Sequence, residues 1–228
     1  YIDDCALDRF TIRRERKILD DNRAAARIDL HSWNHFNEYA GWASCLNMYM
    51  DLLPYIDQVW IGEGRNYDTP PDYWLVEISG IPFGLPGQML QDGGNPWRGM
   101  VYGITNRAGW VKNPPDHLWQ FWDRYGIKDK TMIGYWDAGT PVSTDNDSIK
   151  VTLYKGATES VLALGNFSSA DQQCSVHVDF KKLGYDGSKT TYFIPAIERY
   201  QDRQQLKSLD RLKVPAKKGY LIVLKQDH

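Results

Sequence analysis

Carboxylates, amides and aromatic rings recur in this sequence where short apolar runs end. Carboxylates can act as acid, base or nucleophile in glycosidic bond cleavage, and aromatic rings stack on the apolar faces of pyranoses. Together these residue types indicate a site that binds sugars. With two separated carboxylates, it could also cleave them. The candidate groups, in chain order, are Asp3, Asp4, His31, Trp33, Asn34, Glu63, Arg65, Asp68 and Gln88.

The elements that must position these groups alternate between strand and helix patterns. Such alternation predicts a parallel sheet with right-handed crossovers. About four strand-helix units make half of a (β/α)8 barrel, whose usual length is about 250 residues, and barrel enzymes carry their functional groups at the carboxyl ends of the strands. The predicted strands are 1–4, 27–31, 59–62 and 81–85, and the predicted helices are 10–23, 42–55, 72–79 and 117–125.

The composition changes near residue 137. All nine tryptophans lie between Trp33 and Trp136, and helical periodicity fades after them. Short apolar runs separated by turn residues then predict an antiparallel β-sandwich. We therefore predict an α/β plus all-β protein, with the C-terminal half of a TIM barrel in 1–136 and a small sandwich domain in 137–228. The predicted sandwich strands are 149–154, 160–164, 174–178, 190–194 and 220–224.

Several classes of protein are excluded or receive no support. The net charge of −2 argues against a nucleic-acid-binding surface, and no apolar run is long enough to span a membrane. Three cysteines without CxxC spacing are best interpreted as buried or unreactive thiols, and the alternative is a single disulfide, which the spacing does not support. There is no P-loop, dinucleotide-binding fingerprint, nucleophile elbow or zinc-protease motif. We expect no cofactor and no metal, since the His31 and His35 pair falls in a predicted loop.

The candidate residues also have structural interpretations. Asp3 and Asp4 could serve a turn, and Glu63 could form an ion pair with Arg65. His31 could be an ordinary polar residue with satisfied hydrogen bonds. The glycine-rich stretch 93–98 lacks the lysine and hydroxyl of a P-loop. It predicts a tight turn that presents Trp97 and Arg98 near the mouth of the barrel, where both would contact substrate.

Five stretches resemble bacterial glycoside hydrolases of the family 123-like type. They are YIDDCALDR (1–9), IDLHSWNHFN (28–37), VWIGEGRNYD (59–68), YWLVEISGIPFGLPGQMLQ (73–91) and NPWRGMVYGITNRAGW (95–110). The resemblance covers nearly the whole chain and is most specific in 1–136. It implies a TIM barrel followed by a small C-terminal sandwich, and a carbohydrate substrate.

The resemblance leaves two mechanisms open. Family 123 enzymes use an adjacent acidic pair for substrate-assisted removal of N-acetylhexosamines, and Asp3-Asp4 is similar to that pair, although its usual second member is Glu. The alternative resembles retaining α-galactosidase-type enzymes, in which the nucleophile ends strand four and the acid/base follows strand six. Counting strands assigns these roles to Asp3 and Glu63, with Asp4 as a neighbour. We prefer this second assignment.

The resemblance also implies that an N-terminal portion is missing, and Tyr1 already begins within a strand pattern. We expect little hydrolase activity until that portion of the same protein, or a partner chain, completes the barrel. We expect a periplasmic or extracellular location and a role in polysaccharide degradation. The alternative function is a carbohydrate-binding or scaffold protein that has lost catalysis, which would keep its aromatic rings but lack a properly placed second carboxylate.

Overall fold

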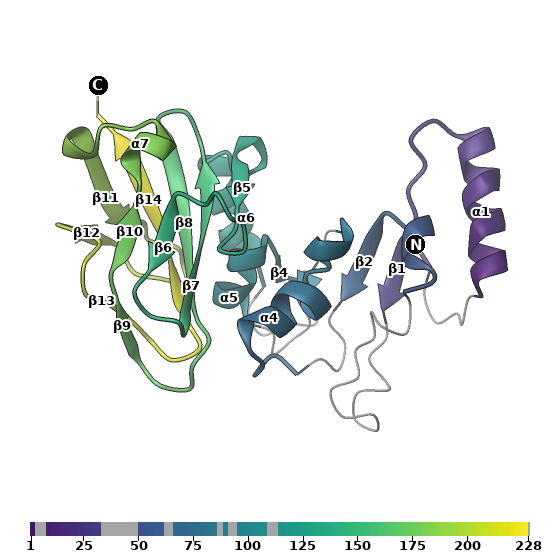
Figure 1. Ribbon diagram of the computed structural model, residues 1–228, viewed down its shortest axis with the longest axis horizontal. Helices are drawn as coiled ribbons and strands as arrows, with labels where there is room; N and C mark the ends of the chain where they lie inside the picture. Colours follow the sequence, from purple (N-terminus) through teal and green to yellow (C-terminus); the bar gives the residue numbers. More distant parts are fainter. Residues whose placement is uncertain are drawn as a thin grey trace. The chain divides into compact units, whose positions relative to one another are not determined.

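A computed structural model describes residues 1–2, 8–32, 50–61, 66–85, 89–90, 95–108 and 114–227 (Figure 1). The chain forms two compact units, Tyr1–Gly94 and Asn95–His228, and each is described here by itself. No helix within the described ranges is both long and apolar enough to cross a lipid bilayer.

The first unit begins with a parallel β arrangement and a crossover helix. Strands β1 and β2 pair in parallel, with Leu30 opposite Val59, and Ile2 forms a parallel bridge to Leu30 on the other side of β1. The predicted parallel arrangement is therefore confirmed for the first three strands. The elements of this unit are α1 (Arg9–Asn22), β1 (Asp29–Ser32), η1 (Leu53–Tyr55), β2 (Gln58–Ile61), α4 (Pro71–Tyr73), η2 (Trp74–Ile78), η3 (Ile81–Phe83) and β3 (Met89–Leu90).

The prediction of a strand at 81–85 is wrong. Residues Ile81–Phe83 form a 3-10 turn, and the glycines on either side of it, Gly80 and Gly84, have φ values of 68° and 73°. Left-handed backbone of this kind interrupts an extended chain, and glycine adopts it without steric cost. The predicted helix at 72–79 is confirmed as a helical segment, formed by α4 and the π-helix η2. Most of the predicted helix 42–55 lies outside the described residues.

The second unit is built on a six-stranded antiparallel sheet in the order β12-β11-β14-β8-β7-β5. The predicted antiparallel fold of this part of the chain is therefore confirmed. Its elements are α5 (Pro96–Gly99), η4 (Met100–Tyr102), β4 (Thr105–Asn106), α6 (Asp116–Arg124), η5 (Ile127–Asp129), β5 (Thr131–Ile133), β6 (Val142–Thr144), β7 (Ile149–Lys155), β8 (Glu159–Asn166), β9 (Gln172–Cys174), β10 (Val176–Val178), α7 (Phe180–Leu183), η6 (Gly187–Lys189), β11 (Thr190–Ile194), β12 (Gln204–Leu206), β13 (Leu212–Val214) and β14 (Gly219–Gln226).

One face of this sheet packs on two antiparallel ribbons, β6 with β10 and β9 with β13. Alternate residues of the central strands, such as Leu162 and Ile222, share a core with Val176 of β10 and Val214 of β13. These side chains are almost completely buried. The sheet and the ribbons thus form the two layers of a sandwich.

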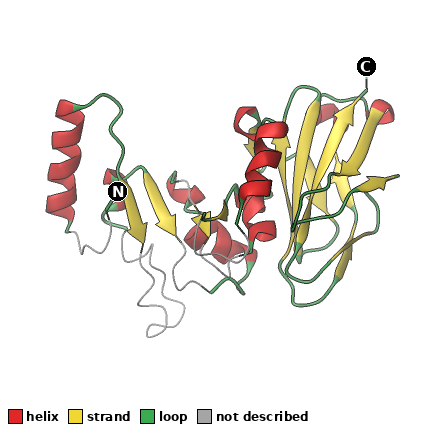
Figure 2. Cartoon of the chain, turned by 180° about the vertical axis from the view of Figure 1, so that it is seen from behind, coloured by secondary structure: helices red, strands yellow, loops and turns green. Residues whose placement is uncertain are grey.

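The other face of the same sheet is covered by the segment that precedes it in the chain. Val161 and Leu221 pack with Leu118 and Phe121 of α6, and Figure 2 shows α6 alongside the strands. Helix α6 ends before Gly126, whose φ of 57° is typical of a glycine after a helix. The central strands are therefore buried on both faces.

This packing explains why the compact units and the composition shift divide the chain at different places. The units separate after Gly94 because the helical segment around α5 and α6 packs on the sheet. The composition shift lies near residue 137, after the last tryptophan. A domain division into 1–136 and 137–228 stays a prediction.

Candidate functional site

The parallel strands of the first unit bring three chain segments to one edge of the sheet. Ile2, Ser32 and Ile61 each stand at the carboxyl end of a described strand segment. Neighbouring parallel strands end at the same edge, where the functional groups of α/β barrels gather. The predicted residues after Ile2, Ser32 and Ile61 thus follow strands that run side by side.

The two faces of these strands differ in chemistry. Leu30 and Val59 lie on one face and are 2% and 1% exposed. The other face carries Asp29, His31 and Gln58, which are only partly buried. The imidazole of His31 stacks on the ring of Tyr1, with 6.2 Å between ring centroids. A polar face that ends at the carboxyl edge of the strands is suited to form hydrogen bonds with a polar ligand.

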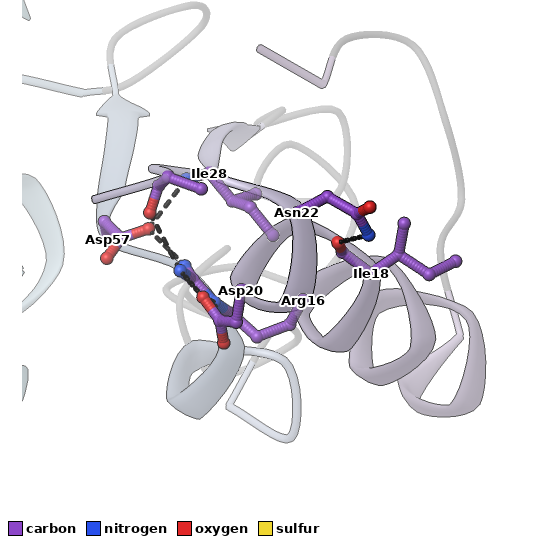
Figure 3. A network of polar contacts seen from close by, with 7 residues as sticks. Arg16, Ile18, Asp20, Asn22, Ile28 and Asp57 are labelled. Carbon is purple, nitrogen blue, oxygen red and sulfur yellow. Dashed lines mark hydrogen bonds and ion pairs between the residues drawn. The ribbon is translucent and has the colours of Figure 1, made fainter. Parts of the chain in front are cut away.

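The starts of the same strands are held by a charged network that has a different role (Figure 3). The Arg16 guanidinium of α1 donates to an oxygen of Asp57 at 2.7 Å and to the carbonyl oxygen of Ala26 at 2.8 Å. The same Asp57 oxygen accepts from Ile28 N at 2.7 Å. A hydrogen bond from Arg16 also lowers the pKa of Asp20. This network anchors α1 at the end of the strands where barrels build stability rather than catalysis.

Of the predicted site residues in the first unit, His31 and Asp68 fall within the described residues. His31 lies in β1, on the polar face. Asp68 is exposed, and its backbone N–H donates to Asn66 Oδ1 at 2.9 Å. The others lie outside the described residues: Asp3, Asp4, Trp33, Asn34, Glu63, Arg65 and Gln88.

Trp97 and Arg98 lie in α5 of the second unit, where each contacts side chains of that unit. The Trp97 ring stacks on Tyr200 at 4.8 Å, and its indole N–H donates to the carbonyl oxygen of Tyr200 at 3.0 Å. Arg98 is 2% exposed, and its guanidinium lies 5.6 Å from the ring centroid of Phe167. The predicted tight turn at these positions is instead the first turn of α5, with Asn95 as its cap. Substrate contact by either residue stays a prediction.

Among the buried polar residues of the first unit, Glu77 and Thr69 were not predicted from the sequence as site residues. Glu77 is 7% exposed and lies in the π-helix η2, and Thr69 is 3% exposed. π-Helical turns occur often at functional sites. A lone carboxylate within the apolar run WLVEI was the signal that could have drawn attention to Glu77. Within the described ranges, no group of three or more His, Cys, Asp or Glu side chains could hold a metal ion.

Two family models match the chain in succession. The model for the glycoside hydrolase 123 TIM-barrel domain matches residues 1–109, and the model for the glycoside hydrolase 123 C-terminal domain matches residues 114–225. No curated protein sequence matches the chain.

Among solved structures, the chain is similar to the crystal structure of a GH30 endoxylanase from Clostridium papyrosolvens C71. The identity is 11% and the TM-score 0.38, over 95% of this chain and 61% of that one. The chain thus spans about three fifths of the length of that structure. A likeness this weak supports no argument about fold or activity.

Proposed function

Because the chain belongs to glycoside hydrolase family 123, we propose that it supplies a carboxylate pair that cleaves O-glycosidic bonds of a complex glycan. Asp3 is the nucleophile, Glu63 the general acid/base, and Asp4 a neighbour that adjusts the charge of the site. The sugar is bound at the same edge by His31, Trp33, Asn34, Arg65, Asp68 and Gln88, with Trp97 and Arg98 as further contacts.

One observation carries this proposal: the strand order Ile2, β1, β2. The strand that Asp3 follows and the strand that Glu63 follows are separated by β1 alone. Neighbouring strands lie about 4.8 Å apart, so two spacings are about 10 Å. Two acidic side chains that lean toward each other over that span can bring their oxygens to the roughly 5 to 5.5 Å that retaining glycosidases use.

The substrate-assisted alternative assigns both roles to the adjacent pair Asp3-Asp4. Successive residues of a strand face opposite sides of the sheet. An adjacent pair therefore needs the strand to end before it if both carboxylates are to face one sugar. The separated pair places its two carboxylates after different strands, on either side of β1, and for this reason we prefer Asp3 with Glu63.

We also propose that further strands complete the barrel, from the N-terminal portion of the same protein or from a partner chain. Ile2 directs its N–H to Asp29 O at 2.8 Å and accepts from His31 N at 3.0 Å, so both of its backbone groups face β1. Along a strand, such groups alternate between its two neighbours. We propose that the further strands pair on the side of Ile2 that faces away from β1. We further propose action on polysaccharides in the periplasm or outside the cell.

The test uses the full-length protein and activated aryl glycosides. Asp3→Asn should reduce turnover at least about a thousandfold, because the covalent intermediate cannot form. Glu63→Gln should reduce it most for poor leaving groups, and azide should restore part of the rate with activated substrates by replacing the missing base. Asp8→Asn is the matched control, since Asp8 caps α1 and asparagine caps equally well.

Three outcomes decide between the alternatives. Normal turnover in Glu63→Gln with a large loss in Asp4→Asn supports the adjacent pair. Normal turnover in all three variants rejects both carboxylate assignments. Glycan binding by a full-length protein without any turnover supports the non-catalytic alternative.

A separate measurement tests the completion of the barrel. Full activity of the isolated 228-residue chain would contradict the need for further strands.

A further inference from the structure

The loop between β11 and β12 forms a rigid, concave and highly charged surface in the second unit. Residues 196–202 line an open surface cavity of about 380 Å³. A second, water-sized cavity of about 30 Å³ lies beside the same loop, and Trp97 and His117 help to line it. The larger volume falls in the range of small-molecule sites, which is about 300–1,000 Å³.

The backbone of this loop is fixed from inside the unit. The buried Gln201 side chain donates to the carbonyl oxygens of Pro195 and Leu221, both at 2.9 Å, and accepts from Leu221 N at 2.8 Å. Ile197 and Gln201 exchange backbone hydrogen bonds of 2.9 Å, and the Tyr200 ring stacks on Trp97. A ligand that binds here would not have to order the loop first.

Within this fixed loop, Arg199 has a strained backbone. Its φ is 62°, in the left-handed region that arginine rarely adopts. Residues held in sparsely populated backbone regions gather at ligand clamps, where the surroundings maintain the strain. Arg211 has left-handed backbone as well, with φ of 53°, so the strain at Arg199 points to a ligand only together with the cavity that Arg199 lines and the charged groups beside it.

Charged groups of both signs meet beside Arg199. His117 Nε2 lies 3.3 Å from an oxygen of Asp116 and 3.3 Å from an oxygen of Glu198. The Arg199 guanidinium lies 3.5 Å from Asp116, and the side chains of Arg199 and Glu198 are 43% and 68% exposed. The cluster therefore presents hydrogen-bond donors and acceptors side by side at the surface.

We propose that this loop is a second saccharide-binding site, which takes a neutral pyranose through its vicinal hydroxyl groups. Each sugar hydroxyl both donates and accepts, so one pair of neighbouring hydroxyls can bond to the Glu198 carboxylate and the Arg199 guanidinium together. The ligand class rests on the glycosidase function proposed above. The site itself does not, because it shares no residue with the predicted carboxylate pair.

The test titrates the 228-residue chain with the methyl glycosides of glucose, galactose and mannose. The indole N–H of Trp97 bonds to the loop carbonyl of Tyr200, so its NMR signal reports binding. We expect a saturable shift with at least one sugar. Arg199→Gly should weaken that binding at least about tenfold, because a charge-assisted hydrogen bond is lost.

Arg211→Gly is the matched control, because Arg211 is also an arginine with a positive φ, 53°, and it does not line the loop. Both glycine variants should fold and be at least as stable as the parent, since glycine adopts this backbone without strain. Binding should be unchanged in Arg211→Gly.

Absence of a saturable Trp97 shift with all three sugars overturns the proposal, and so does binding that Arg199→Gly leaves intact. Binding that is lost in Asp3→Asn and kept in Arg199→Gly also overturns it, while supporting the catalytic proposal. The two proposals can therefore fail separately.

Discussion

The parallel strands of the first unit and the antiparallel strands of the second reverse the usual relation between topology and burial. Parallel strands are commonly buried on both faces, and antiparallel sheets often leave one face to solvent. Here β1 carries the apolar Leu30 on one face and the partly buried His31 on the other. On β14, the neighbours Leu221 and Ile222 point to opposite faces and are both almost completely buried.

The comparison shows that a strand face becomes part of a core when a segment from elsewhere in the chain packs on it. The segment around α5 and α6 covers the second face of the antiparallel sheet and makes it part of a core. The polar face of β1 and β2 instead ends at the carboxyl edge of the strands, where we propose that the sugar is bound. We therefore expect stability to depend mainly on the second unit and recognition of substrate on the first.

The largest effect on stability should come from the doubly buried sheet. Leu221→Ala and Ile222→Ala each remove a fully packed side chain, one from each face, and each should lower the free energy of unfolding by about 2–5 kcal/mol. Urea denaturation measures this. Lys225→Ala, at an exposed position of the same strand, is the control. A free energy of unfolding that Leu221→Ala leaves almost unchanged would mean that the segment around α5 and α6 does not cover the sheet in solution.

A smaller loss should follow when hydrogen bonds between the sheet and the helical layer are removed. Thr152 Oγ1 donates to Val101 O and the Tyr154 hydroxyl to Met100 O, both at 2.6 Å. Thr152→Val and Tyr154→Phe leave buried carbonyl oxygens without these donors and should each cost about 1–3 kcal/mol in unfolding free energy. Thr191→Val, which removes an exposed hydroxyl, should cost less. Equal losses for Thr152→Val and Thr191→Val would contradict this account.

In the first unit, the charged network at the strand starts should contribute less to the free energy of unfolding than either core of the second unit. Arg16→Met removes two hydrogen bonds that hold α1 to the strands, and we expect a loss of about 1 kcal/mol because the pair is partly exposed. The matched control is Lys17→Met, since Lys17 pairs only along the exposed face of α1 with Asp21. Thermal unfolding of both variants should separate them. Equal melting temperatures for Arg16→Met and Lys17→Met would show that the network does not anchor α1.

The smallest effect concerns the chemistry of a thiol in the sandwich core. Burial raises the pKa of Cys174 to about 11. The folded state therefore favours the neutral thiol, and its contribution to stability, complete below the ordinary thiol pKa of about 8.5, is lost as the pH rises toward 11. Iodoacetamide at neutral pH should leave Cys174 unmodified in the native chain and modify it in urea. Peptide mass mapping identifies the residue, and rapid native labelling would show that this core opens.

The sequence predicted a good part of the fold from local patterns. The strands 149–154 and 190–194 were found because β-branched and apolar residues cluster between turn residues, and 117–125 was found because its apolar spacing repeats at three and four residues. Cys174 is buried, as its residue type suggests. Strands β12 and β13 were missed because three residues, two of them glutamines in β12, carry too little pattern and become strands only by pairing.

For the candidate site too, the sequence determined some features and tertiary structure decided the others. By themselves, the residues of the sequence determined the family resemblance and the strand after which each acidic group stands. Only tertiary structure decided that Ile2 and β2 flank β1, that residues 81–85 turn back at two left-handed glycines, and that Trp97 stacks on Tyr200 more than a hundred positions away. The physical reason is that periodicity is a local property of the chain. Which surface a face meets depends on contacts between distant segments, and a single sequence does not record them.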